Sequence, residues 1–592
     1  MKKFRIIIDA FYNWRLRNIS TKTFIIILSI IIGILSGFIV VIIKNAVKLA
    51  YGLLNVFTID SLHNYLLFIY PIIGIALTVL FIKYILRKPV RPGIPNVLYS
   101  ISKRKGFISF HNTFSSVITS ALTVGFGGSV GLEGPTVSTG SAIASQLARF
   151  FRLEHKYVLL MLACACAGSM AAIFKAPIAA IVFAVEVIMI DLTTFSLIPL
   201  LLASASAVVT SYLFLGMDVL YPFEVKTAFV VNELPFYIAL GIVAGLVSVY
   251  FTLMHNYLAQ YFARFKTRLA RLAVGGTMLG LLLILFPSLY GEGYEAINSG
   301  LSGNLEYLFD RSFFGQFSEN IWGIMVLLLC VVLFKVVATS ATFGAGGVGG
   351  IFAPTLFIGV NTGLLFATLV NKLFGFNINV SNFALVAMAG LIAGVLHAPL
   401  TGIFLIADIS GGYVLFVPLM ITAAFSYLTT KIFTENSVFT IQLAQRKQLV
   451  THHKDKHALL LMNVPELIES DFTILKPTDK LRDLVEAITV SHRDLYPVVD
   501  SEGIMVGMLK LDDVRHLIFK QIDYDRIPIN ELMYMPEHWI SPNDSMDEVV
   551  DKFEDSGRFN LAVINNGKYM GFISRASVYT NYRNYIKDFS SD

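Results

Sequence analysis

Long uncharged runs dominate the first three quarters of the chain. No Asp, Glu, Lys or Arg occurs in residues 23–43, 65–82, 234–254, 336–371 or 409–430. Since a helix needs about 20 apolar residues to span a bilayer, the pattern predicts an all-α polytopic membrane domain with roughly ten hydrophobic stretches. Many of these stretches are short or contain Gly or Pro, which is typical of broken membrane helices rather than simple spans.

The end of the chain follows a different pattern. Residues 451–592 hold 16 Lys and Arg against 24 Asp and Glu, whereas residues 1–450 hold 30 against 16. We therefore expect a membrane domain at 1–450, a polar linker at 451–462 and a soluble tail beyond it. With 55% hydrophobic and 15% charged residues, the chain is neither an ordinary soluble enzyme nor disordered. The basic excess lies in the membrane part, so nucleic acid is not an expected partner.

Basic residues cluster before the first hydrophobic run. The basic residues that precede this run include Lys2, Lys3, Arg5, Arg15 and Arg17. Lys and Arg favour the cytoplasmic side of a membrane protein, so we expect the N-terminus and the tail in the cytoplasm. The expected location is the inner or plasma membrane.

Two blocks of sequence recur about 220 residues apart. Ala-Pro at 176–177, followed by Glu186, matches Ala-Pro at 398–399, followed by Asp408, at an offset of 222. The Gly-rich block 127–135 resembles 346–354 at an offset of 219. This indicates two related halves, which in transporters often run antiparallel with the substrate site between them. Shared small-residue helix packing is the alternative.

Three Gly-Pro segments, at 91–95, 125–135 and 349–354, predict helix starts inside the membrane. Pro suits a first turn because its missing N–H costs nothing there. Helix starts present unpaired N–H groups and a partial positive charge, so several meeting at one point would bind a small anion without Lys or Arg. Glu133 lies in the middle segment, where its carboxylate could occupy the anion site and leave it on protonation. A structural helix cap is the alternative role.

These motifs resemble those of the CLC family of chloride channels and chloride/proton exchangers, over nearly the whole chain. The family's Gly-Ser-Gly-Ile-Pro appears as Arg-Pro-Gly-Ile-Pro at 91–95, its Gly-Lys/Arg-Glu-Gly-Pro as Gly-Leu-Glu-Gly-Pro at 131–135, and its Gly-x-Phe-x-Pro as Gly-Ile-Phe-Ala-Pro at 350–354. The resemblance implies a homodimer with one pore per subunit, chloride or a similar small anion as cargo, and Glu133 as the gate. It places the anion-binding positions at Pro92, Gly93, Ile94, Gly131, Gly134, Ile351, Phe352 and Phe439.

Four departures from the family's pattern bear on selectivity and mechanism. Pro92 stands in place of a serine, Leu132 in place of a basic residue and Phe439 in place of a tyrosine. Because these polar side chains are missing, backbone amides should carry more of the anion binding. Chloride, nitrate and fluoride all remain open as the preferred anion. Val187 stands where exchangers carry a second glutamate that hands protons to the gate, and Glu186 precedes it.

A valine cannot carry a proton. The sequence therefore favours a passive gated channel, with an anion/proton exchanger as the alternative. A CBS-regulated cation carrier would need more intramembrane carboxylates. A membrane-embedded hydrolase would need a metal set or a nucleophile with a base, so we expect no enzyme.

The tail repeats an order of strand, helix, two strands and helix, and resembles a pair of CBS domains at 463–525 and 526–592. Such pairs often bind adenine nucleotides in the family. The usual signature is only partly met, because Lys510 and Ser577 replace two of its residues. Asp513 and Ser574 are the candidate nucleotide contacts. No cofactor is required for transport, and a purely structural, dimer-stabilising tail is the alternative.

Overall fold

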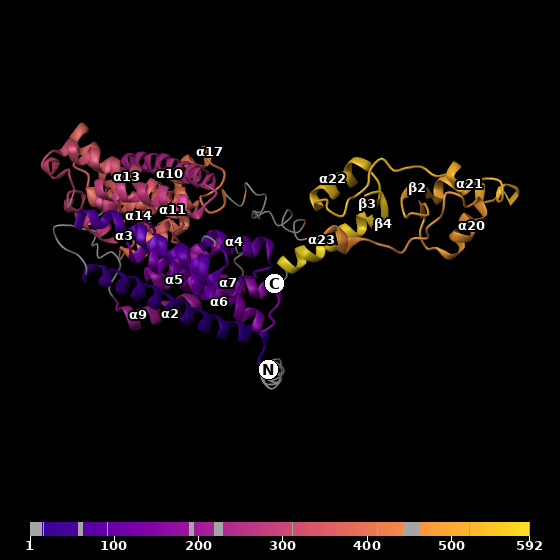
Figure 1. Ribbon diagram of the computed structural model, residues 1–592, viewed down its shortest axis with the longest axis horizontal. Helices are drawn as coiled ribbons and strands as arrows, with labels where there is room; N and C mark the ends of the chain where they lie inside the picture. The colour runs from indigo at the N-terminus through magenta and orange to yellow at the C-terminus, as the bar shows by residue number, and fades with distance from the viewer. Residues whose placement is uncertain are drawn as a thin grey trace. The chain divides into compact units, whose positions relative to one another are not determined.

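The computed structural model divides into two units, Met1–Leu449 and Val450–Asp592, each described by itself below (Figure 1). The basic residues before Arg15, the predicted anion contact Pro92 and most of the linker 451–462 lie outside the described residues. The described residues are 15, 17–56, 63–90, 93–188, 194–217, 229–310, 312–410, 412–441, 444, 459, 462–519 and 521–590.

The first half of the membrane unit is built from helices of very different lengths. In the described part of the chain as a whole, nine helices are long and apolar enough to cross a membrane. Others are much shorter, as the interrupted hydrophobic runs predict. The elements of this half are α2 (Thr21–Val56), α3 (His63–Leu80), the π-helix η2 (Phe81–Leu86), α4 (Gly93–Lys103), α5 (Asn112–Gly125), α6 (Glu133–Phe150), α7 (His155–Phe174), α8 (Pro177–Glu186) and α9 (Thr194–Leu215).

The second half repeats this mixture of long and short helices, with short 3₁₀ turns between them. Its α-helices are α10 (Leu234–Ala263), α11 (Arg268–Leu285), α12 (Tyr294–Leu301), α13 (Ile321–Ala345), α14 (Phe352–Phe374), α15 (Val380–Leu396), α16 (Pro399–Ile409) and α17 (Phe416–Phe433). Its 3₁₀ turns are η3 (Val231–Glu233), η4 (Pro287–Leu289), η5 (Glu306–Leu308) and η6 (Gly315–Phe317).

The two halves share their local backbone geometry, which confirms the predicted repeat. α6 and α14 begin 219 residues apart, and α8 and α16 begin 222 residues apart. Lys175 and His397, just before α8 and α16, both adopt the left-handed conformation, with φ of 58° and 56°. Few residues other than Gly adopt this conformation, so its presence at matched positions is a specific sign of a shared fold.

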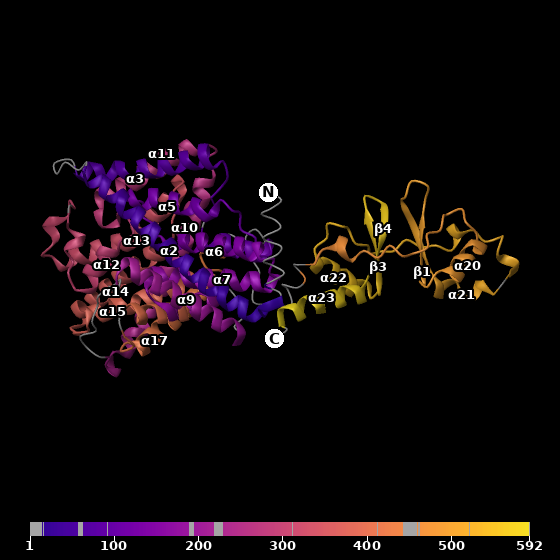
Figure 2. The same ribbon diagram turned by 90° about the horizontal axis from the view of Figure 1, so that it is seen from below.

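Small residues let matched helix pairs approach closely in both halves. α2 lies beside α9 (Figure 1, Figure 2), and a Cβ added to Gly33 or Gly37 would collide with α9. α10 lies beside α17 in the same way, and a Cβ on Gly245 would lie 2.6 Å from the Cβ of Thr429. Gly at every fourth position is a typical contact surface between membrane helices, since lipid gives no hydrophobic drive for association.

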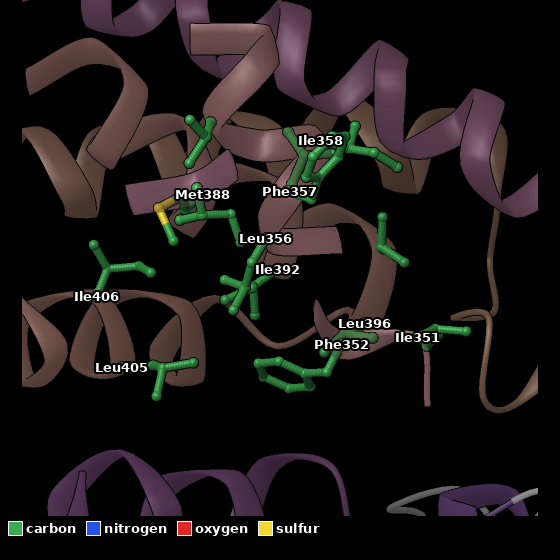
Figure 3. Packing of buried hydrophobic residues seen from close by; sticks show 14 of the residues in the cluster. Ile351, Phe352, Leu356, Phe357, Ile358, Met388, Ile392, Leu396, Leu405 and Ile406 are labelled. Carbon is green, nitrogen blue, oxygen red and sulfur yellow. The ribbon is translucent and has the colours of Figure 1, made fainter. Parts of the chain in front are cut away.

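The core of the second half lies between α14 and α15. Leu356, Phe357 and Ile358 of α14 pack in one buried cluster with Met388 and Ile392 of α15 (Figure 3). This packing fixes α14, and thereby the position of the N-terminus of α14.

The tail forms two α/β modules, as the CBS resemblance predicts. In the first, β1 (Leu495–Val499) pairs antiparallel with β2 (Met505–Lys510), and in the second β3 (Asn560–Asn565) pairs with β4 (Lys568–Ser574). Leu475 and Ile540 add a parallel bridge to β1 and β3 respectively. The remaining elements are η7 (Val464–Leu467), α20 (Leu481–Val490), α21 (Leu511–Ile518), η8 (Gln521–Asp523), η9 (Ile529–Glu531), α22 (Met546–Ser556) and α23 (Arg575–Ser590).

Candidate anion pathway

The N-termini of α4, α6 and α14 meet at one place inside the membrane unit. A Cβ added to Gly93, the first residue of α4, would collide with the backbone of Gly134 in the first turn of α6. A Cβ on Gly134 would in turn lie 3.2 Å from the carbonyl oxygen of Gly349, just before α14. Only a glycine permits this approach at position 93, and position 134 leaves little room for a side chain. Pro95, Pro135 and Pro354 each occupy the third position of their helix, where no intrahelical donor is lost.

The two matched Gly-rich segments are joined by a pair of backbone hydrogen bonds. The N–H of Gly131 donates to the carbonyl of Gly350 (2.8 Å), and the N–H of Gly350 donates to the carbonyl of Gly131 (2.7 Å). Since α6 and α14 start directly after these residues, the bridge aligns their N-termini. It also occupies the N–H of Gly131, so in this arrangement that predicted anion contact has no N–H to offer.

A cavity of about 470 Å³ lies against this meeting point. Its lining includes six of the predicted anion-binding residues, namely Gly93, Ile94, Gly134, Ile351, Phe352 and Phe439. Arg268 and Arg271 at the start of α11 line it as well. The structure thus brings together most of the predicted site.

Glu133 is the first residue of α6, and its side chain is fully buried beside the cavity. Its Oε1 accepts a hydrogen bond from the Tyr294 hydroxyl at 2.7 Å. The carboxylate also faces the backbone N–H groups of Glu133 itself and of Ala353 in α14. A negative group therefore occupies the place where two helix N-termini meet, which is the place predicted for the anion.

A cluster of charged residues that sequence reasoning missed lies next to Glu133. Glu292, between η4 and α12, interacts electrostatically with Glu133, Lys44 and Lys335, and accepts a hydrogen bond from the N–H of Leu132. Lys335 of α13 is fully buried, and its Nζ donates to the carbonyls of Leu289 and Gly291, both at 3.1 Å.

The segment that carries Glu292 is anchored on the Gly-rich segment before α6. The Ser129 hydroxyl donates to the Leu289 carbonyl at 2.7 Å, and the Gly291 N–H donates to the Gly127 carbonyl at 3.2 Å. This segment comes just after the C-terminal end of α11, whereas Arg268, at the N-terminal end of the same helix, lines the cavity. The charged cluster and the cavity therefore lie toward opposite ends of α11. Glu133 thus lies between the cavity and the charged cluster.

Glu186 and Asp408 cap each other's helices. Glu186, at the end of α8, accepts from the N–H groups of Leu400 (3.1 Å) and Thr401 (2.8 Å) at the start of α16. Asp408, near the end of α16, accepts from the N–H of Ala179 (3.3 Å) at the start of α8. This reciprocal cap joins the two halves. The Glu186 carboxylate is therefore engaged structurally, and Val187 beside it is buried and apolar.

The candidate nucleotide contacts lie in different modules of the tail. Asp513 is exposed in the first turn of α21. Ser574, at the end of β4, donates its hydroxyl to Glu469 Oε1 at 2.7 Å. A ribose hydroxyl would have to compete with that carboxylate for Ser574.

Comparison with known proteins identifies the family. Residues 74–431 match the voltage gated chloride channel family, and residues 464–520 and 529–583 match the CBS domain. A protein of Ralstonia nicotianae described as a putative chloride channel protein, ClcB-like, is 30% identical over 386 residues, which are 64% of this chain and 85% of that protein. The chain belongs to the voltage-gated chloride channel (CLC) family of anion transport proteins and carries a C-terminal CBS pair, which confirms the resemblance seen in the motifs.

Further relatives and solved structures agree with this assignment. The voltage-gated ClC-type chloride channel ClcB of Escherichia coli K12 is 26% identical over 358 residues, which are 60% of this chain and 81% of that one. The crystal structure of a CLC-type fluoride/proton antiporter covers 71% of this chain and 98% of its own, with a TM-score of 0.58 at 24% identity. A eukaryotic CLC transporter covers 94% and 99%, with a TM-score of 0.61 at 17% identity. These structures share the fold of the chain.

Proposed function

We propose that this protein conducts small anions such as chloride passively through the cavity, and that Glu133 is its gate. One observation carries the proposal: a buried carboxylate occupies the point where the N-termini of α6 and α14 meet, directly beside a cavity lined by predicted anion-binding residues. Helix N-termini attract anions, so a chloride ion and the carboxylate compete for the same N–H groups. Protonation of Glu133 removes its charge and leaves the site to the anion.

Val187 and its neighbour Glu186 support channel behaviour rather than exchange. The carboxylate next to Val187, that of Glu186, is held by two backbone N–H groups of α16. Val187 has no titratable group, and the Glu186 carboxylate is engaged as a helix cap. Exchange is the second candidate because two structural neighbours are described as a fluoride/proton antiporter and a slow cyanobacterial chloride/proton antiporter.

The gate is tested by anion efflux from liposomes that contain purified protein. We expect the wild-type efflux rate to rise as the pH falls, because acid neutralises the gate. E133Q, which mimics the protonated side chain, should give fast efflux that no longer depends on pH. A wild-type pH dependence retained in E133Q would contradict the assignment of Glu133 as the gate.

We also propose that the chain acts as a homodimer in the inner or plasma membrane, with its N-terminus and tail in the cytoplasm. Large apolar side chains at the starts of α8 and α16 support a protein or lipid contact there, since Ile178 is 46% exposed and Leu400 is 53% exposed. Cross-linking of Leu400→Cys in native membranes tests the dimer, and labelling of a cysteine in the tail from each side tests the orientation. Adenine nucleotide binding by the tail stays a prediction.

A further inference from the structure

A histidine and a serine that belong to none of the three motifs also line the cavity. His255 of α10 and Ser340 of α13 lie in the same lining as Ile351, Phe352 and Phe439. The His255 Nδ1 and Ser340 Oγ atoms are 2.9 Å apart, so a hydrogen bond joins the two helices at the cavity wall.

The surroundings of Ser340 favour one of the two neutral tautomers of His255. Ser340 is only 3% exposed, and His255 is its one side-chain hydrogen-bond partner among the described residues. A neighbouring buried hydroxyl, that of Thr342, donates instead to the carbonyl of Ala338. A buried hydroxyl without an acceptor is costly, so Ser340 donates to Nδ1. In the neutral imidazole the proton is then on Nε2.

The ring of His255 is held in one orientation. It stacks on Phe251, with ring centres 6.2 Å apart, and meets the edge of Phe343 at 5.8 Å. In the part of the chain that the structure describes, no residue accepts a hydrogen bond from Nε2, and the ring lines the cavity. A preorientated N–H donor is therefore open to the cavity.

We propose that the Nε2–H of His255 forms an additional anion-binding subsite of the pore, with Ser340 as its positioning residue. The ligand class is a small inorganic anion such as chloride. This proposal rests on the proposed function, because it places the subsite along the pathway that leads to Glu133. Arg268 and Arg271 line the same cavity and raise the local anion concentration. Phe439 offers the anion no hydroxyl, so the imidazole supplies a side-chain donor that the motifs lack.

The test is the chloride dependence of efflux from liposomes, compared between wild type and substitutions of His255. H255F keeps a flat ring but removes both nitrogens. Because a hydrogen bond to an ion is lost, we expect the half-saturating chloride concentration to rise roughly tenfold. H255Q restores an N–H donor and should stay within about threefold of wild type. The matched control is H111F, since His111 contacts Ser115 (3.5 Å) but does not line the cavity. We expect no change in H111F.

An unchanged half-saturating concentration in H255F, with an active wild type, would overturn the subsite and leave the proposed function standing. If H255F does not fold, S340A decides the matter: loss of the positioning hydroxyl should weaken chloride binding, and wild-type binding would overturn the proposal. If the wild type shows no efflux, the proposed function fails. Calorimetric titration of wild type and H255F with chloride then still tests the subsite, which predicts weaker binding in H255F and is refuted by equal binding.

Discussion

Replacing Tyr294 with Phe removes one oxygen atom and should release the gate. The Tyr294 hydroxyl lies 2.7 Å from Glu133 Oε1 and donates to it. A hydrogen bond to a charged group contributes about 1.5–3 kcal/mol, which corresponds to roughly 10- to 150-fold in the equilibrium between the seated and the displaced carboxylate. The Phe ring keeps the shape of the site, so the effect comes mainly from this bond. Y294F should therefore raise the chloride efflux rate at neutral pH toward the rate of E133Q.

The assay is chloride efflux from liposomes at equal protein density. Y307F is the matched control, because the buried Tyr307 hydroxyl makes an equally short bond of 2.7 Å to Asn361 Oδ1. It should leave the efflux rate near wild type. Efflux in Y294F no faster than in Y307F would refute the reasoning that this hydroxyl holds Glu133 in place.

Four further predictions concern the helix contacts, the buried charges and the tail. G93A should abolish efflux and lower the thermal unfolding midpoint, because the added methyl group collides with the backbone of α6. K335M should cost about 1–3 kcal/mol of stability in detergent, since the Gly291 carbonyl loses its donor, whereas the Leu289 carbonyl keeps the Ser129 hydroxyl. The double variant E292Q/K335M should cost less than the sum of its parts, as a thermal double-mutant cycle would show. In the tail, the Arg482 guanidinium hydrogen-bonds Asp525 and holds the pKa of that carboxyl below its usual range. The ion pair stabilises the fold at pH values above about 3.9, the pKa of an Asp carboxyl in the unfolded chain. This stabilisation is lost as the pH falls through the lower pKa that Asp525 has in the folded state. Hydrogen exchange at the Arg482 amide should therefore show acid-dependent loss of protection in wild type but not in D525N.

The helical framework and the repeat could be predicted from the sequence because their signals are local. Apolar runs, the matched Ala-Pro pairs and the Gly-Pro segments gave the helix starts at Gly93, Glu133 and Phe352, and the structure places them as expected. The order of strands and helices in the tail could also be predicted, and the structure has the expected strand pair in each module.

Three of the missed residues share one cause. Lys44, His255 and Lys335 each stand at the edge of an uncharged run, and a polar residue there reads as the end of a membrane segment. In the structure all three lie inside long helices, α2, α10 and α13. An ionisable residue within a membrane helix is a functional candidate by default, and that signal was available.

Glu292 could not be found in this way. Its sequence, Gly-Glu-Gly-Tyr at 291–294, reads as a polar loop. Only the anchoring of this segment on Ser129 and Gly127 brings it to Glu133, and that contact joins residues about 160 positions apart. The reciprocal cap of Glu186 and Asp408 is likewise a tertiary feature. The sequence showed both acids at matched positions, but not that each holds the other's helix.

The most direct test of the account is simultaneous measurement of chloride and proton movement. Purified protein in liposomes is given a chloride gradient, the voltage is clamped with an ionophore, and the external pH is recorded as chloride flows. The account predicts chloride flux without proton movement, because Val187 carries no proton and Glu186 is held as a helix cap. Protons driven uphill by the chloride gradient would contradict it and identify an exchanger with another proton route to Glu133.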